Sequence, residues 1–294
     1  MAMKPTRDAL AILLALISSI ALALGVTGSW VRDNVVSPQG FIDVVGPMAS
    51  DRAVQQDFAE SALADIAPDL PVPDWARDKV EEILASQVHV VTDSDAYGEI
   101  WVASMRDLHS ELMQGGRAQL TADIAPVWDH MAQPIDDLLP FGWEVPVPKS
   151  TVITLTEFDA TWFSHLVTLA ESATLFLVLG FASALGAVLL GSRRLFALGA
   201  VGLGWLGAGF GLWFALSNAR VLLPQGITEE KFVGPVLTAF AERAAGDLTS
   251  TSTLGMGVGG GLLVIAILAA VTLTAVRVRS EKRAGVERPL GDKS

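Results

Sequence analysis

The chain has 294 residues, of which 51% are hydrophobic and only 18% are charged, and its mean hydropathy is +0.46. Soluble domains carry about 25% charged residues on average, so this composition argues against a soluble globular enzyme and against a disordered chain. The sequence contains no cysteine, which excludes disulfides, thiolate metal sites and a cysteine nucleophile. The net charge of −12 disfavours nucleic acid as a partner.

Four apolar stretches are long enough to cross a bilayer, because about 20 helical residues span a hydrocarbon core of about 30 Å. We predict transmembrane helices over residues 9–26, 172–190, 195–216 and 254–276. Each stretch is expected to be helical, since lipid offers no hydrogen-bond partner to an open backbone. The remaining segments are an N-terminus at 1–8, a large loop at 27–171, a turn at 191–194, a second loop at 217–253 and a tail at 277–294.

Basic residues set the expected orientation, because the cytoplasmic loops of membrane proteins are enriched in Lys and Arg. Arg193 and Arg194 occupy the short turn, and six Lys or Arg residues follow the fourth stretch. Between Thr27 and Ser164 there are instead 7 basic and 23 acidic residues. We therefore predict a multi-pass protein of the bacterial plasma membrane with both termini in the cytoplasm. A cleaved signal peptide at Ala21 to Ala23 is the alternative for the first stretch.

The large loop is expected to form an α-rich domain that begins with three helices, whose apolar residues recur at helical spacing. The runs and their expected starts are Val54 to Ile66 after Ser50, Trp75 to Val88 after Asp74, and Tyr97 to Leu112 after Asp95. Gly115 and Gly116 follow the third run and should end that helix.

Two later runs of the large loop have the period of a β-strand. Residues 117–124 alternate apolar and polar side chains, and residues 149–156 are rich in β-branched residues. In the second run we expect Thr156 to share a face with Val152 and Thr154. The two runs are predicted to pair with each other in a short two-stranded sheet.

The expected fold class is an α-helical membrane protein with four transmembrane helices and an α-rich, α+β extracytoplasmic domain. A helical hairpin arm is expected at 126–140, between the two strands. From Asp159 the helical pattern continues unbroken to Leu190, so one helix should join the domain to the second span.

Three sequence features support a family resemblance. They are residues 30–47, the Trp101-x4-Arg106-x2-His109 helix with its two following glycines, and the step Asp123-Ile124-Ala125-Pro126. With the four-span layout, they resemble an uncharacterised family of actinobacterial integral membrane proteins with a large extracytoplasmic domain. The resemblance implies this topology and brings no assigned activity.

Few polar side chains stand out as functional candidates. Arg106 and His109 are one helical turn apart and could present a polar cluster, or could simply bond a loop of the domain. Glu171 is expected at the outer end of the second span, with Arg220 as its ion partner. A carboxylate within lipid is usually functional, whereas one at the bilayer surface is ordinary. The histidines lack metal-ligand spacing, so no metal, cofactor or catalytic residues are predicted.

Glycines in the third and fourth spans indicate close packing of helices. The pairs four residues apart are Gly207 and Gly211, Gly255 and Gly259, and Gly257 and Gly261. Small residues at this spacing allow helix backbones to approach each other in lipid. We expect the third and fourth spans to pack within a bundle or against a partner.

These features favour a non-enzymatic membrane protein, an envelope scaffold, sensor or accessory subunit that presents an acidic domain to a membrane or envelope protein partner. Transport or lipid handling is a second hypothesis, in which the bundle or the outer domain holds an apolar ligand. An envelope enzyme whose site is assembled from distant residues is a third.

The predicted orientation is tested with a reporter enzyme that is active only in the periplasm. Fusion after Trp143 should give an active reporter, because the acidic loop is expected outside the cytoplasm. Fusion after Arg194 should give an inactive one. The opposite pattern would reverse the orientation.

Overall fold

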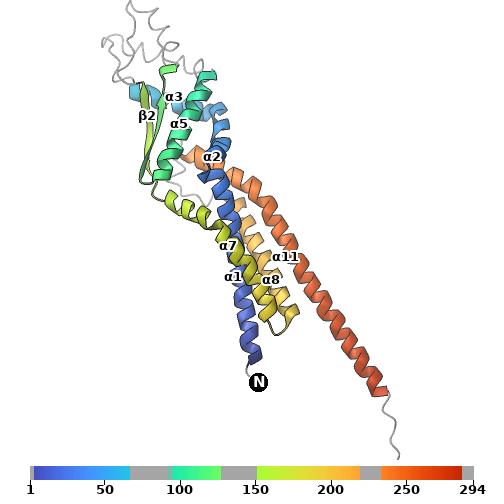
Figure 1. Ribbon diagram of the computed structural model, residues 1–294. Helices are drawn as coiled ribbons and strands as arrows, with labels where there is room; N and C mark the ends of the chain where they lie inside the picture. Colours follow the sequence, from blue (N-terminus) through green and yellow to red (C-terminus); the bar gives the residue numbers. More distant parts are fainter. Residues whose placement is uncertain (1–2, 67–91, 93–94, 127–150, 219–232, 287–294) are drawn as a thin grey trace, which may run out of the picture. The chain divides into compact units, whose positions relative to one another are not determined.

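A computed structural model describes residues 3–66, 92, 95–126, 151–218 and 233–286 (Figure 1). The chain divides into two compact units. We call the first the helical unit, which comprises Met1–Thr27, Ser172–Ser217 and Ala245–Ser294. The second, the mixed unit, comprises Gly28–Glu171 and Asn218–Ala244 and contains a two-stranded sheet.

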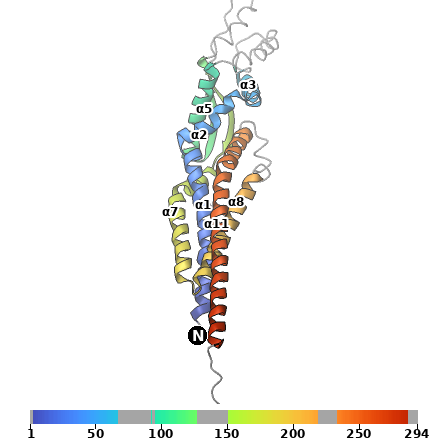
Figure 2. The same cartoon turned by 90° about the vertical axis from the view of Figure 1, so that its right-hand side faces the viewer.

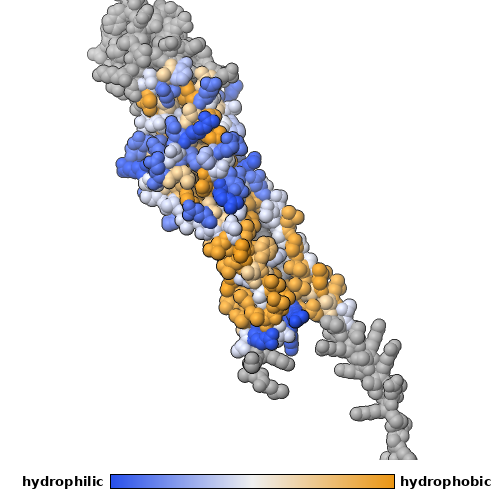
Figure 3. Space-filling view, viewed as in Figure 1, coloured by the Kyte–Doolittle hydropathy of each residue, from blue (hydrophilic) through white to orange (hydrophobic). Residues whose placement is uncertain are grey.

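Four helices are long and apolar enough to cross a membrane, which confirms that prediction. They are α1 (Met3–Val31), α7 (Phe163–Leu190), α8 (Arg194–Ser217) and α11 (Val233–Val286). Each predicted span lies within one of them. Only 11% to 33% of the most apolar window of each helix is buried, and the face shown in Figure 3 is covered by apolar side chains over the helical unit. Apolar surface of this extent suits lipid, so the chain is an integral membrane protein.

Glycines bring α8 and α11 into close contact in the helical unit, where the two helices run side by side (Figure 2). A Cβ atom on Gly202 would lie 2.6 Å from the carbonyl oxygen of Gly259, and the reverse distance is also 2.6 Å. Two turns further along, a Cβ atom on Gly209 would lie 2.9 Å from the carbonyl oxygen of Ser252. The two backbones therefore touch at positions where a side chain has no room.

Polar contacts attach α1 to α8 and to the turn between α7 and α8. The indole Nε1–H of Trp205 donates to Oγ of Ser18 at 3.0 Å, between two apolar helices. Near the start of α1, the carboxylate of Asp8 accepts the backbone N–H of Ser192 at 3.0 Å. Nε of Arg7 donates to the carbonyl oxygen of Leu190 at 3.0 Å, which satisfies an acceptor at the end of α7.

The mixed unit is built from short helices packed with the sheet. Its elements before α7 are the π-helix η1 (Arg32–Val36), α2 (Pro38–Val45), the 3₁₀ helix η2 (Gly46–Ser50), α3 (Arg52–Ile66), α5 (Asp95–Gln114), β1 (Arg117–Asp123) and β2 (Val152–Asp159). The core follows the predicted stripe of α5, from Tyr97 to Leu112. At its centre, Trp101 is fully buried and donates Nε1–H to the carbonyl oxygen of Val45 at 2.9 Å.

Helix boundaries agree with the sequence pattern at some ends and differ at others. Gly115 and Gly116 follow α5 with φ of 75° and 94°, a backbone conformation that favours glycine. The predicted cap of α3 was Ser50, but the carboxylate of Asp51 accepts the N–H of Ala53 at 2.8 Å instead. Ser50 cannot serve because it ends η2.

Two of the predicted elements lie outside the described residues. They are the helix over 75–88 and the arm at 126–140, of which only residue 126 is described. The helix that was expected from Asp159 begins at Phe163, because β2 extends to Asp159. There the Asp159 carboxylate accepts the N–H of Thr161 at 2.9 Å and turns the chain into α7.

The two strands pair antiparallel, as predicted, but with a bulge that changes one face of β2. Leu120 pairs with Thr156 and Thr121 pairs with Thr154, so Leu155 has no partner across the ladder. Paired residues share a face, and the extra residue reverses the alternation along the strand. Thr156 therefore lies on the face of Leu120, and the expectation that it shares a face with Thr154 is wrong.

Alanine substitution tests the contact between α8 and α11. Alanine is a better helix former than glycine by about 1 kcal/mol, so Gly257→Ala, which adds a Cβ atom in open space, should leave stability unchanged or raise it. Gly259→Ala should lower it by about 1–3 kcal/mol, because its Cβ atom would collide with the α8 backbone. Thermal unfolding of the two variants in detergent measures the difference. Equal effects would show that the contact is not close.

Candidate functional site: an apolar cavity in the mixed unit

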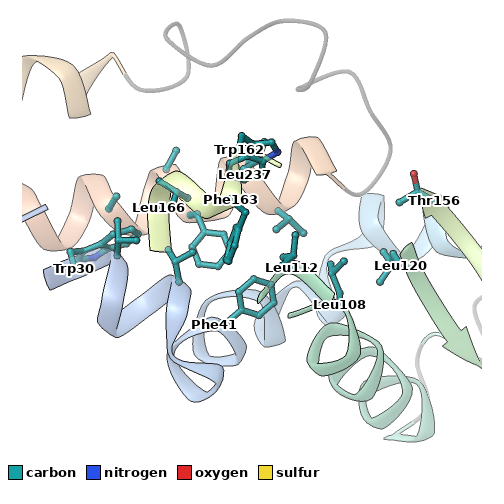
Figure 4. Close-up of a pocket in the computed structure, with 16 residues that line it drawn as sticks. Trp30, Phe41, Leu108, Leu112, Leu120, Thr156, Trp162, Phe163, Leu166 and Leu237 are labelled. Carbon is teal, nitrogen blue, oxygen red and sulfur yellow. The ribbon is translucent and has the colours of Figure 1, made fainter. Parts of the chain in front are cut away.

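The mixed unit encloses a cavity of about 250 Å³ whose wall is almost entirely apolar (Figure 4). Residues of α1, η1, α2, α5, both strands, α7 and α11 contribute to the wall. Thr156, which the bulge in β2 turns toward Leu120, supplies the only hydroxyl group among the lining residues. The wall carries no ionisable side chain.

The lining residues follow an elongated space. In Figure 4, Trp30 lies at one end and Thr156 at the other, with Phe41 and Phe163 between them. At the other end, Leu120 is 1% exposed and Leu108 is 4% exposed, whereas Thr156 beside them is half-buried. At the end near Trp30, the side chains of Trp30 and Leu166 are half-buried as well.

The α11 wall has the spacing of one helix face. Val236, Leu237, Phe240, Ala241 and Ala244 recur at intervals of three and four residues, as an apolar stripe does. Phe240 packs against Phe41 with ring centroids 5.3 Å apart. The two alanines fill less space than the aromatic residues beside them, which leaves room along this part of the wall.

His109 positions part of the wall, although it does not line the cavity. Its buried ring packs against Phe41 at a centroid distance of 5.0 Å. Its Nε2 lies 3.2 Å from the carbonyl oxygen of Val35 and 3.1 Å from that of Val36, so Nε2 carries the proton and donates to both. Burial lowers the pKa of His109, although the two carbonyl groups act in the opposite direction. The neutral ring thereby holds η1, and with it the lining residue Val35.

The other polar candidates do not meet at one site. Arg106 is exposed on α5, whereas His109 is buried, so the pair does not form a shared polar cluster. Glu171 is exposed at the end of its segment of the mixed unit. Its expected partner Arg220 lies outside the described residues. Among the residues described, no three His, Asp or Glu side chains gather in a way that could hold a metal ion.

Of the six glycines singled out by sequence, Gly259 is the one that meets the backbone of another helix. A Cβ atom would meet nothing within 4 Å at Gly207, Gly211, Gly255, Gly257 or Gly261. The close contact instead uses Gly202 and Gly209 on α8, which the four-residue spacing did not identify. These two are seven residues apart, and that spacing returns to the same helix face after two turns.

The helical unit has an apolar cavity of its own, of about 400 Å³. Two of its lining hydroxyl groups are bonded within their own helices. Oγ of Ser19 donates to the carbonyl oxygen of Ala15 at 2.8 Å, and Oγ of Ser252 donates to that of Leu248 at 2.7 Å. This cavity is lined by segments of the four helices that are long and apolar enough to cross a membrane, so its apolar wall gives less information about a specific ligand.

Comparison of the chain with protein-family models, with curated proteins and with solved structures finds no match. Function is therefore inferred from the cavity of the mixed unit and from the membrane-length helices.

The neutral state of His109 predicts how stability depends on pH. The folded protein has the lowered pKa, so below about 6.5, the ordinary pKa of histidine, only the unfolded chain gains the proton. The free energy of unfolding should therefore be highest above pH 6.5 and fall as the pH drops toward the lowered value. His109→Gln keeps an N–H donor for η1 but cannot titrate.

Thermal unfolding of wild type and His109→Gln in detergent, between about pH 8 and pH 5, measures this contribution. The pKa values of Asp123 and Asp159 are also lowered, by backbone N–H donors, but both carboxyl groups are present in both proteins and cancel in the comparison. Parallel pH curves for the two proteins would contradict the role given to His109.

Proposed function

We propose that the protein is a non-enzymatic membrane protein that handles or senses lipids, with an apolar ligand held in the cavity of its mixed unit. The observation that carries the proposal is the cavity wall, which has one hydroxyl group and no ionisable side chain. Ligand sites are concave and mostly apolar, and their few polar groups orient the ligand. A wall without an ionisable acid or base to activate its one hydroxyl group supports binding rather than catalysis.

The helices that line the cavity support a lipid as the ligand class. Three of them, α1, α7 and α11, also contain the apolar segments long enough to cross a bilayer. A ligand that fills the cavity would recover packing free energy on the order of several kcal/mol, at about 24 cal/mol per Å³. Membrane lipids are the apolar molecules that such a chain meets at the highest concentration.

We propose that the mixed unit lies outside the cytoplasm and that both termini lie inside it, in a bacterial plasma membrane. Arg193, which precedes α8, and Arg194, its first residue, are exposed, as expected of residues on the cytoplasmic side. The excess of acidic over basic residues in the large loop supports its placement outside. The family resemblance to actinobacterial four-span proteins is consistent with this topology and stays a prediction.

Association with another membrane protein is a second candidate function, which makes the protein an accessory subunit. It is favoured by the open faces of α8 and α11 at Gly207, Gly257 and Gly261, where a second helix could approach closely. On this proposal, a stoichiometric partner is recovered when the protein is isolated from native membranes in mild detergent. Recovery of the bare chain in every mild detergent contradicts it.

Ligand binding is tested on the same isolated protein by mass spectrometry of the small molecules that it carries. Wild type should carry a stoichiometric apolar ligand. Ala241→Phe should retain at least about tenfold less ligand, because the added ring occupies the cavity. This reduction corresponds to a loss of about 1.4 kcal/mol or more in binding free energy. Ala53→Phe places the same ring on an exposed position of α3 and should retain the ligand.

Ala244→Phe, which fills the cavity from the next turn of α11, repeats the test if Ala241→Phe fails to fold. Wild-type protein that carries no apolar molecule overturns the proposal. Equal retention by the wild type and the folded cavity variants does so as well.

A further inference from the structure

Resting on the proposed function, we infer that the cavity takes one unbranched alkyl chain, such as that of a fatty acid or a membrane lipid. The chain lies lengthwise, with its methyl end at Leu120 and its polar group outside the cavity, at the end near Trp30. The ligand class is thereby narrowed from apolar molecules in general to a linear chain that enters end-on.

The shape of the cavity selects a linear ligand. The labelled residues lead from Trp30 to Thr156, and Phe41 and Phe163 stand between these ends (Figure 4). At about 250 Å³, the space accommodates on the order of eight methylene groups, if each occupies roughly the 30 Å³ of a water molecule in the liquid. A fused ring system of similar volume is wider and shorter than such a chain.

The polarity of the wall excludes a headgroup from the interior. A carboxylate or phosphate inside an apolar cavity needs a cation or several hydrogen-bond donors that converge on it, and the wall carries no cation. The side-chain donors of the wall are the hydroxyl of Thr156 and the indole N–H groups of Trp30 and Trp162. Trp30 and Thr156 lie at opposite ends of the cavity, so these donors do not converge on one anion (Figure 4). The polar end of the ligand must therefore remain outside.

Continuity with the membrane-length helices sets the direction of entry. At the Leu120 end, Leu108 and Leu120 are buried, at 4% and 1% exposed, and Thr156 beside them is half-buried. Trp30 and Leu166 at the opposite end are half-buried, and tryptophan suits a boundary between apolar and polar surroundings. These two residues belong to α1 and α7, which continue as apolar segments of membrane length.

The experiment measures the affinity of the full-length protein for a series of saturated fatty acids of increasing length. Digitonin is the detergent, because its rigid steroid-like body supplies no competing linear chain. Each added methylene should raise the affinity about fourfold, from about 0.8 kcal/mol per buried group. The increase should stop when about eight carbon atoms are buried, because later ones lie outside the cavity.

Leu120→Ala should move this limit toward longer chains, by roughly three carbon atoms, because it removes three carbon atoms from the wall at the end opposite Trp30. Leu155→Ala is the matched control. It deletes the same atoms from a buried residue of β2 that does not line the cavity, so it should leave the limit unchanged. Thr156→Val should leave the affinity unchanged or raise it. If the polar group of the ligand were bound at Thr156, the same substitution would lower the affinity.

Lysophospholipids and diacyl lipids with the same chains distinguish a free fatty acid from a membrane lipid as the natural source. Saturable binding of a fatty acid, or of a lipid that carries the same chain, supports the inference that the cavity holds a linear alkyl chain. A limit that does not move in folded Leu120→Ala overturns the inference, and so does an affinity that does not depend on chain length. Isolated protein that carries an apolar ligand while failing the chain-length test refutes this inference alone, whereas protein that binds no apolar molecule refutes the proposed function too.

Discussion

The structure depends on one constraint, which is that helices surrounded by lipid gain little by burying apolar side chains against each other. Contact between them must come from backbones that approach closely and from hydrogen bonds that have no competing water. Gly202 and Gly259 provide the first, and the bond from Trp205 to Ser18 provides the second. The large aliphatic side chains of the same helices remain exposed, because lipid solvates them as well as a protein core would.

The mixed unit obeys the opposite rule, since burial of apolar side chains holds it together. Trp101, Tyr97 and Met105 of α5 are almost completely buried in its core. This core does not close fully, because the small side chains Ala241 and Ala244 leave space beside larger aromatic residues. The apolar cavity is therefore a consequence of which residues α11 contributes.

Two local features position residues of the cavity wall. The bulge at Leu155 places Thr156 on the face of Leu120, at the end of the cavity opposite Trp30. Neutral His109 bonds two carbonyl groups of η1 and supports Phe41, so it orders two parts of the wall without touching the interior. The bulge changes the backbone pairing of the strands, and His109 bonds to backbone carbonyl groups. Neither feature adds an ionisable side chain to the wall of the cavity.

The sequence by itself determined the four membrane-length helices, the α5 stripe and the pairing of β1 with β2, because each depends on the periodicity of apolar residues within one segment. It did not reveal the cavity, whose residues come from segments as far apart as Trp30 and Ala244. Nor did it show that Arg106 and His109 separate, or that Gly202 and Gly209, rather than Gly207 and Gly211, meet α11. The rotation of one helix against its neighbours decides these points, and only the tertiary structure fixes that rotation, since several faces of a glycine-rich or apolar helix satisfy the same local pattern.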